Sequence, residues 1–155
     1  MDDSLKSDFE IVLEAVQHDG YELKYADDKL KADRELVLAA LKQNEVNSSY
    51  SALEFADESL KADREIVLEA VRLHPNSLSW AAESLQADKE VVLEAVKKDG
   101  NLIKQADDSL KNDHEVVLAA IQNMDYPSLS FADDSLKKDR ELMLKMVQID
   151  GSLLE

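Results

Sequence analysis

Apolar residues recur along the chain in a ten-residue pattern that is written six times. The segment ADREIVLEAV at 62–71 shows it clearly: Asp is followed two places later by Glu, and then by a stretch in which only one place is polar. A helix that is apolar around most of its circumference must be covered on several sides. The pattern therefore predicts a buried α-helix in each copy. The copies open at Asp8, Asp33, Asp63, Asp88, Asp113 and Asp139.

The spacing of the copies predicts how they are assembled. The opening Asp residues follow one another at intervals of 25, 30, 25, 25 and 26 residues. A nearly fixed period of this size is typical of a stacked repeat array. One unit buries too few aliphatic side chains to offset the conformational entropy of its own backbone. Each unit therefore needs its neighbours to fold.

The two ends of the predicted helix carry their own signals. The opening Asp is predicted to be the N-cap, and the Glu after it suits the positive end of the helix dipole. Twelve places after the Asp stands a residue that ends the helix, where glycine can adopt the left-handed conformation and proline cannot continue the helix. This residue is Gly20, Pro75, Gly100 or Gly151 in four units, and Glu45 or Asp125 in the other two.

A weaker apolar pattern follows each predicted helix, as in SLSWAAESLQAD at 77–88. Leu78, Ala81 and Leu85 fall at i, i+3 and i+7, which is one face of a short helix. The predicted fold is therefore an all-α solenoid, or superhelix, of about six two-helix repeats of roughly 25 residues. In each repeat the second helix is short or a 3₁₀-helix. Residues 1–155 are interpreted as one array.

Composition restricts the class of partner. Acidic residues outnumber basic ones 34 to 18, which gives a formal charge of −16. Such a surface repels nucleic-acid phosphates and anionic membranes, so a partner steered by charge is basic. The absence of cysteine removes disulfides and thiolate chemistry. No signal peptide or transmembrane segment is seen, so we expect a cytoplasmic location, with export as an effector as the alternative.

Three segments carry a family resemblance: YADDKLKADRELVLAAL at 25–41, FADESLKADREIVLEAV at 55–71 and QADDSLKNDHEVVLAAI at 105–121. Their motif L–x–x–D–x–E–Φ–Φ–L, with Φ apolar, resembles the tandem short-helix repeats called domain of unknown function 4116, over essentially the whole chain. That family has no assigned catalytic residues or cofactor. Its members are often multi-repeat proteins of bacteria and protists, some effector-like, so the resemblance implies partner binding.

A weaker likeness is to the leucine-rich variant repeats, which alternate an α-helix with a 3₁₀-helix in a superhelix. The segment at 63–88, with Pro75 in place, is similar to one such unit. Some members of that group carry an iron–sulfur segment, which this chain lacks because it has no cysteine.

Large side chains recur about eighteen residues into each unit and predict a column along the array. One interpretation is that they fill the core between units. The other is that they line a groove for a partner peptide, with a glutamine as a specific polar contact. The column consists of Tyr25, Phe55, Trp80, Gln105 and Phe131. An insertion at 45–49 adds Tyr50 as a candidate exposed aromatic residue.

Acidic residues recur toward the end of the second segment and predict an acidic edge. The edge is either a solvated face or a docking strip for a Lys- and Arg-rich partner. Calcium binding lacks support because no glycine-containing calcium loop is present. The acids are Asp27, Asp28, Asp57, Glu58, Glu83, Asp107, Asp108, Asp133 and Asp134.

Catalytic signals are absent from the sequence. His18, His74 and His114 fall at three different places in the unit, which does not suit a zinc site. The recurring serines have no neighbouring base, and there is no Gly-rich phosphate loop. We therefore expect no enzyme, cofactor or metal, but a protein–protein interaction scaffold with an acidic surface that binds a basic or amphipathic segment. The alternatives are an acidic nucleic-acid mimic and a spacer or oligomerisation module, with self-association through the repeat ends.

Overall fold

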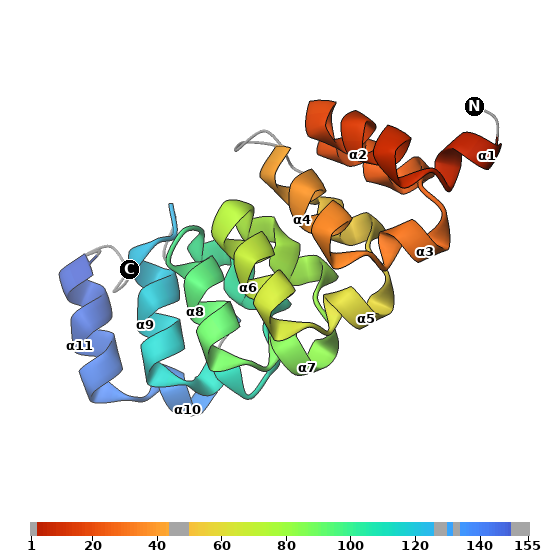
Figure 1. Cartoon of the computed structure of the whole chain (residues 1–155). Helices are drawn as coiled ribbons and strands as arrows, with labels where there is room; N and C mark the ends of the chain where they lie inside the picture. The colour runs from red at the N-terminus through yellow and green to blue at the C-terminus, as the bar shows by residue number, and fades with distance from the viewer. Residues whose placement is uncertain (1–2, 44–49, 126–129, 132–133, 150–155) are drawn as a thin grey trace.

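The computed structural model describes residues 3–43, 50–125, 130–131 and 134–149, and these contain α-helices and 3₁₀-helices without a strand. The long helices stand side by side in one row, each in contact with the next, with α2 at one end of the row and α11 at the other (Figure 1). They are α2 (Phe9–His18), α4 (Arg34–Gln43), α6 (Arg64–Leu73), α8 (Lys89–Val96), α9 (His114–Gln122) and α11 (Arg140–Ile149). The all-α class is confirmed, and the superhelical course stays a prediction.

The segment after each of the first four long helices forms two elements rather than one. A 3₁₀-helix comes first, and these helices contact one another in order. They are η1 (Gly20–Tyr25), η2 (Ala52–Phe55), η3 (Pro75–Trp80) and η4 (Gly100–Gln105). A single helical turn follows, and these turns line one edge of the row (Figure 1). They are α1 (Asp3–Lys6), α3 (Asp28–Lys31), α5 (Glu58–Lys61), α7 (Glu83–Gln86), η5 (Leu110–Asn112) and α10 (Asp134–Lys137).

An extended alanine separates the two elements, which corrects the prediction of one continuous short helix. Ala81 has φ −69° and ψ 149°, and its N–H donates to the carbonyl of Leu78 before the chain turns away. Leu78, Ala81 and Leu85 are all buried, as the apolar pattern requires, but they lie on two helices and the residue between them. The alternation of α-helix and 3₁₀-helix expected from the leucine-rich variant likeness is present, with one α-helical turn added.

Every long helix begins as the sequence predicts. The carboxylate of Asp63 accepts hydrogen bonds from the backbone N–H groups of Glu65 and Ile66, at 3.0 and 3.1 Å. These bonds satisfy two of the four N–H groups that a helix leaves free at its start. The opening Asp accepts at least one such bond in all six units.

The hydrophobic core runs through all the units as one cluster. In each internal long helix the third, fourth, seventh and eighth places after the Asp are buried, as in Ile66, Val67, Ala70 and Val71, which are all fully buried. The leucine at the fifth place packs on the margin of this core: Leu68 is buried, while Leu38, Leu93 and Leu118 are half-buried. The copies therefore cover one another's apolar faces. No helix in the described ranges is both long and apolar enough to cross a bilayer.

A repeated backbone hydrogen bond joins the short helices of neighbouring units. The N–H of Asp57 donates to the carbonyl of Lys31, the last residue of α3, at 2.9 Å. The same bond joins Asp27 to Lys6, Ala82 to Lys61, and Asp107 to Gln86. It satisfies a carbonyl that the end of a helix would otherwise leave free. These four junctions are therefore fixed in register by the main chain as well as by the core.

The glycine prediction is wrong in its mechanism. No residue has a positive φ in the described part of the chain, so Gly100 does not close a helix in the left-handed conformation. It begins η4 instead, and its N–H donates to the carbonyl of Asn123, at the end of α9, at 2.9 Å. A Cβ at this position would lie 1.9 Å from the carbonyl oxygen of Ala120. Glycine is required here by the close approach of the next unit.

Candidate interaction surface

The residue after the opening Asp, called here the cation position, pairs with the next unit in four units. Arg64 binds Asp88 through Nε at 2.8 Å and Glu90 through Nη2 at 2.5 Å. Lys89 reaches both Asp113 and Glu115 at 2.9 Å. Arg34 makes the same pair of contacts with Asp63 and Glu65, and His114 lies 3.4 Å from Asp139. The Asp–x–Glu pair therefore caps its own helix and also binds the preceding unit.

These contacts change the titration of the carboxylates. The side-chain hydrogen bond from Arg64 lowers the pKa of Asp88 from its ordinary value of 3.8, against an opposing contribution from partial burial. The same pair raises the pKa of Arg64. Hydrogen bonds from Ser59 and Ser109 likewise lower the pKa of Asp57 and of Asp107. The lowered pKa favours the charged form of Asp57, Asp88 and Asp107.

The cost of replacing Asp88 with asparagine should depend on pH. Asparagine keeps the cap but loses the charge, so at pH 7 we expect a loss of up to about 1 kcal/mol. Because the folded protein lowers this pKa, the stabilisation is present above 3.8 and disappears as the pH falls through the folded value. Urea denaturation at pH 7, 5 and 3 should show the difference between variant and wild type shrinking. Glu83→Gln, at an exposed residue, serves as the control, and a cost that is independent of pH would contradict this assignment.

The junction between α2 and α4 departs from this scheme. Phe9 occupies the cation position of α2, so no Arg or Lys from that position reaches Asp33 and Glu35. Asp33 still caps α4 by accepting from the N–H of Leu36 at 2.9 Å. Glu35 is exposed and forms no ion pair with any described residue. Its equivalents Glu65 and Glu90 each bind an arginine.

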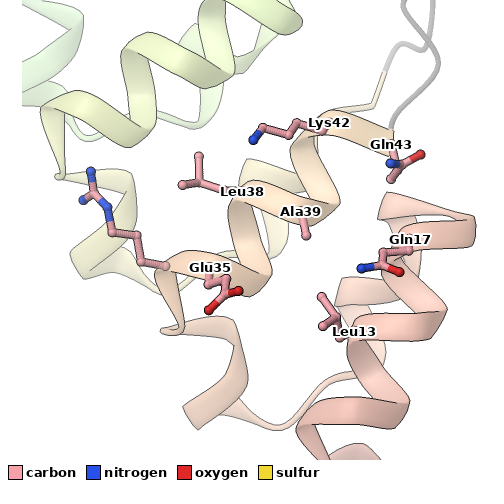
Figure 2. A pocket seen from close by; sticks show the side chains of 8 residues that line it. Leu13, Gln17, Glu35, Leu38, Ala39, Lys42 and Gln43 are labelled. Atoms are coloured by element: carbon pink, nitrogen blue, oxygen red, sulfur yellow. The ribbon is translucent and has the colours of Figure 1, made fainter.

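A groove of about 760 Å³ opens at this junction (Figure 2). Leu13 of α2 and Leu38 and Ala39 of α4 supply the apolar part of its lining. Glu35 lies near the start of α4 and Lys42 near its end, with Leu38 and Ala39 between them. Lys42 lies seven residues after Glu35, which corresponds to about 10 Å along the helix axis. The groove is lined by Leu13, Gln17, Arg34, Glu35, Leu38, Ala39, Lys42 and Gln43.

The structure divides the predicted aromatic column. Tyr25 and Trp80, at the ends of η1 and η3, are 50% and 39% exposed, and Gln105 is exposed at the end of η4. Phe55 and Phe131 are half-buried and pack against the core. Neither simple interpretation therefore describes the whole column. A partner-binding role for it stays a prediction.

The first part of the column belongs to an aromatic cluster that the sequence analysis did not identify. The ring of Tyr21 lies 5.1 Å from that of Phe55 and 5.4 Å from that of Tyr50, which is 57% exposed. Lys24 Nζ lies 3.8 Å from the ring centre of Tyr21 and 4.5 Å from that of Tyr25. The side chain of Tyr25 raises the pKa of Lys24. The contact between Tyr21 and Lys24 could have been predicted from their spacing of three residues, because side chains at i and i+3 lie above one another in a 3₁₀-helix.

The acidic edge is partly neutralised by lysines of the same unit in four units. The first acid of a pair caps the short helix or turn, as when Asp57 accepts from the N–H of Ser59 at 2.9 Å. The second acid pairs with a lysine three places on, as when Glu58 binds Lys61 at 2.8 Å. The same lysine pairing holds for Asp28, Asp108 and Asp134, while Asp27 and Asp107 are caps. Asp133 lies outside the described residues.

Glu83 is the exception along this edge. It is exposed, and Gln86 stands where the other units have lysine. The preceding residue is Ala82, which has no side chain to cap α7. Along the described edge, Glu83 therefore lacks the lysine partner that the equivalent acids have. It offers a basic partner fewer free carboxylates than the sequence suggests.

The histidines have three different environments. His74 is buried, and its Nε2 lies 2.9 Å from the carbonyl oxygen of Leu41 in the preceding unit. Nearby, the buried hydroxyls of Ser51 and Ser77 share a hydrogen bond of 2.7 Å. His18 and His114 are exposed beside Glu14 and Asp139. His74 and the serines thus fasten the units on either side of the 45–49 insertion, which lies outside the described residues.

Fold and surface together define an all-α tandem-repeat protein whose units are joined by core packing, ion pairs and main-chain hydrogen bonds. The family model described as domain of unknown function DUF4116 matches five times, over residues 1–31, 8–48, 46–86, 88–127 and 123–155. The chain belongs to this family, as its motif predicted. Comparisons with curated proteins and with solved structures give no match.

Proposed function

We propose that the protein is a non-enzymatic binding scaffold and that the groove between α2 and α4 receives an amphipathic helix from a partner protein. The observation that carries this proposal is the state of Glu35. At the junctions after α4 and α6 the equivalent glutamate binds an arginine of the preceding unit. Here Phe9 replaces that arginine, and Glu35 lines a groove whose lining is partly apolar.

Charge complementarity specifies the occupant. A lysine or arginine on the partner would bind Glu35, as Arg34 binds Glu65 at the next junction. Apolar side chains would pack on Leu13, Leu38 and Ala39, which supplies most of the affinity. An acidic residue about two helical turns from the basic one would then meet Lys42. Lys42 is exposed and forms no ion pair within the described residues.

A designed peptide tests this proposal. The probe is a fluorescent amphipathic helix of about 15 residues whose leucine and alanine face carries Arg and Glu seven places apart. We expect saturable binding by fluorescence anisotropy, and a loss of about tenfold or more for Glu35→Lys, because attraction becomes repulsion in a partly desolvated groove. A peptide with Glu in place of the Arg should bind the wild-type protein correspondingly more weakly.

Glu83→Lys is the matched control, because it makes the same charge change at an exposed glutamate of the acidic edge. It should leave the affinity nearly unchanged. If Glu83→Lys weakens binding while Glu35→Lys does not, the acidic edge is the binding surface and the groove is not. If neither the peptide with Arg nor the peptide with Glu binds the wild-type protein, the groove proposal is wrong. The cytoplasmic location and the effector role expected from the sequence stay predictions.

A further inference from the structure

The first unit exposes a surface that the internal units bury against a neighbour. At the third place after the opening Asp, Leu36, Ile66, Val91 and Val116 have no exposed area, and Leu142 is 2% exposed. The corresponding residue of α2, Ile11, is 38% exposed. The leucine of the preceding short helix shows a similar trend: Leu5 is 37% exposed, Leu30 is half-buried, and Leu60 and Leu85 are 8% and 7% exposed. Leu5, Asp8, Glu10 and Ile11 form what we call the head face.

The last described unit exposes the complementary surface. At the fourth and eighth places after the Asp, the internal helices hold fully buried residues such as Val92 and Val96. In α11 these places are Met143 and Val147, which are only half-buried. Leu144 beside them is 46% exposed. Arg140, Met143, Leu144 and Val147 form the tail face, and their spacing places them on one side of the helix.

The charges on the two faces match the ion-pair scheme of the internal junctions. Arg140 is at the cation position of α11 and forms no ion pair with a described residue. Asp8 accepts hydrogen bonds from the N–H groups of Glu10 and Ile11, but neither Asp8 nor Glu10 binds a cation in the described structure. Arg64 fills this role for Asp88 and Glu90. The head face therefore offers the carboxylates that Arg140 requires.

We infer that a second copy of this chain docks its head face on the tail face of the first. The junction would repeat the internal geometry, with Ile11 and Leu5 covered by the helix of the other copy and Arg140 bound to Asp8 and Glu10. The two faces differ, so the contact is heterologous and the same step can be repeated to extend a row of copies. This inference uses a different surface from the α2–α4 groove and stands independently of it.

Charge reversal at the two faces tests the inference. Sedimentation velocity of the 155-residue chain up to about 1 mM should show reversible self-association, which is within the range expected of a weak contact. Arg140→Glu and Glu10→Lys should each raise the dissociation constant about tenfold, because each places like charges together. Both changes are at exposed positions, and circular dichroism checks that the helices are retained. Glu83→Lys should have no effect.

Mixing the two variants gives the decisive result. The tail of Glu10→Lys and the head of Arg140→Glu are both wild type, so an equimolar mixture should recover association that each variant lacks alone. A tail-to-tail or head-to-head contact would not be recovered in this way and would overturn the inference. A chain that stays monomeric over the whole concentration range would overturn it as well, since another occupant would then have to cover the head face.

Discussion

Replacing Gly100 with alanine is expected to lower the free energy of unfolding by about 3 kcal/mol, the upper end of the range for overpacking. The added Cβ would lie 1.9 Å from the carbonyl oxygen of Ala120 and 2.8 Å from its carbonyl carbon. Both atoms belong to the backbone of α9, so a side-chain rotation cannot relieve the overlap. The two units must move apart, and the hydrogen bond from Gly100 to Asn123 would be weakened with them.

Thermal denaturation followed by circular dichroism measures this effect. For a chain of this size, about 3 kcal/mol corresponds to a fall in Tm of roughly 10 °C. Lys104→Ala, at an exposed residue of the same 3₁₀-helix, is the control and should stay within about 0.5 kcal/mol of wild type. Equal stability of Gly100→Ala and wild type would contradict the close approach of η4 and α9.

The cost of truncating one isoleucine should depend on whether a preceding unit covers it. Ile66→Ala is expected to lower the free energy of unfolding by about 3–4 kcal/mol, because Ile66 of α6, which packs against α4, is fully buried and its truncation leaves a cavity. Ile11→Ala makes the same change at the same place of the first unit. Ile11 is 38% exposed, so we expect less than about half that loss.

Urea denaturation at low protein concentration compares the two variants without a contribution from self-association. The residue type, the helix position and the substitution are matched, so the difference reports the coverage by the neighbouring unit. Similar losses for the two variants would mean that each unit is stabilised mainly from within. That result would contradict the mutual covering of units on which the repeat interpretation depends.

Much of the fold follows from positions that repeat in the sequence. The opening Asp predicts an N-cap because it stands directly before an apolar run, where its carboxylate can accept from a free N–H of the first helical turn. Asp63 accepts two such hydrogen bonds. The division of the second segment into a 3₁₀-helix and a helical turn could not be predicted from the sequence. Leu78, Ala81 and Leu85 have the spacing of a helix face whether or not the backbone is extended at Ala81. The role of Gly100 was wrongly predicted because the sequence shows that a side chain is absent there but does not show the neighbouring backbone of α9 that excludes one.

The interaction surfaces were less predictable because they depend on contacts between units. Arg34 and Glu65 are 31 residues apart, and their pairing requires the stacking of α4 on α6 to be known first. The importance of Phe9 appears only after that pairing is seen, since it is the exception that leaves Glu35 without an arginine. The acidic edge looked more highly charged in the sequence than it is, because Lys61 and its equivalents fold back on it.

The backbone hydrogen bond between short helices has a consequence for how such proteins change in length. The backbone N–H of Ala82 donates this hydrogen bond just as those of Asp27, Asp57 and Asp107 do, so the bond does not depend on the side chain at that position. A duplicated or deleted unit would find the same main-chain partner on either side. Duplication or deletion of whole units in the gene can thus change the length of the array without requiring new contacts between units.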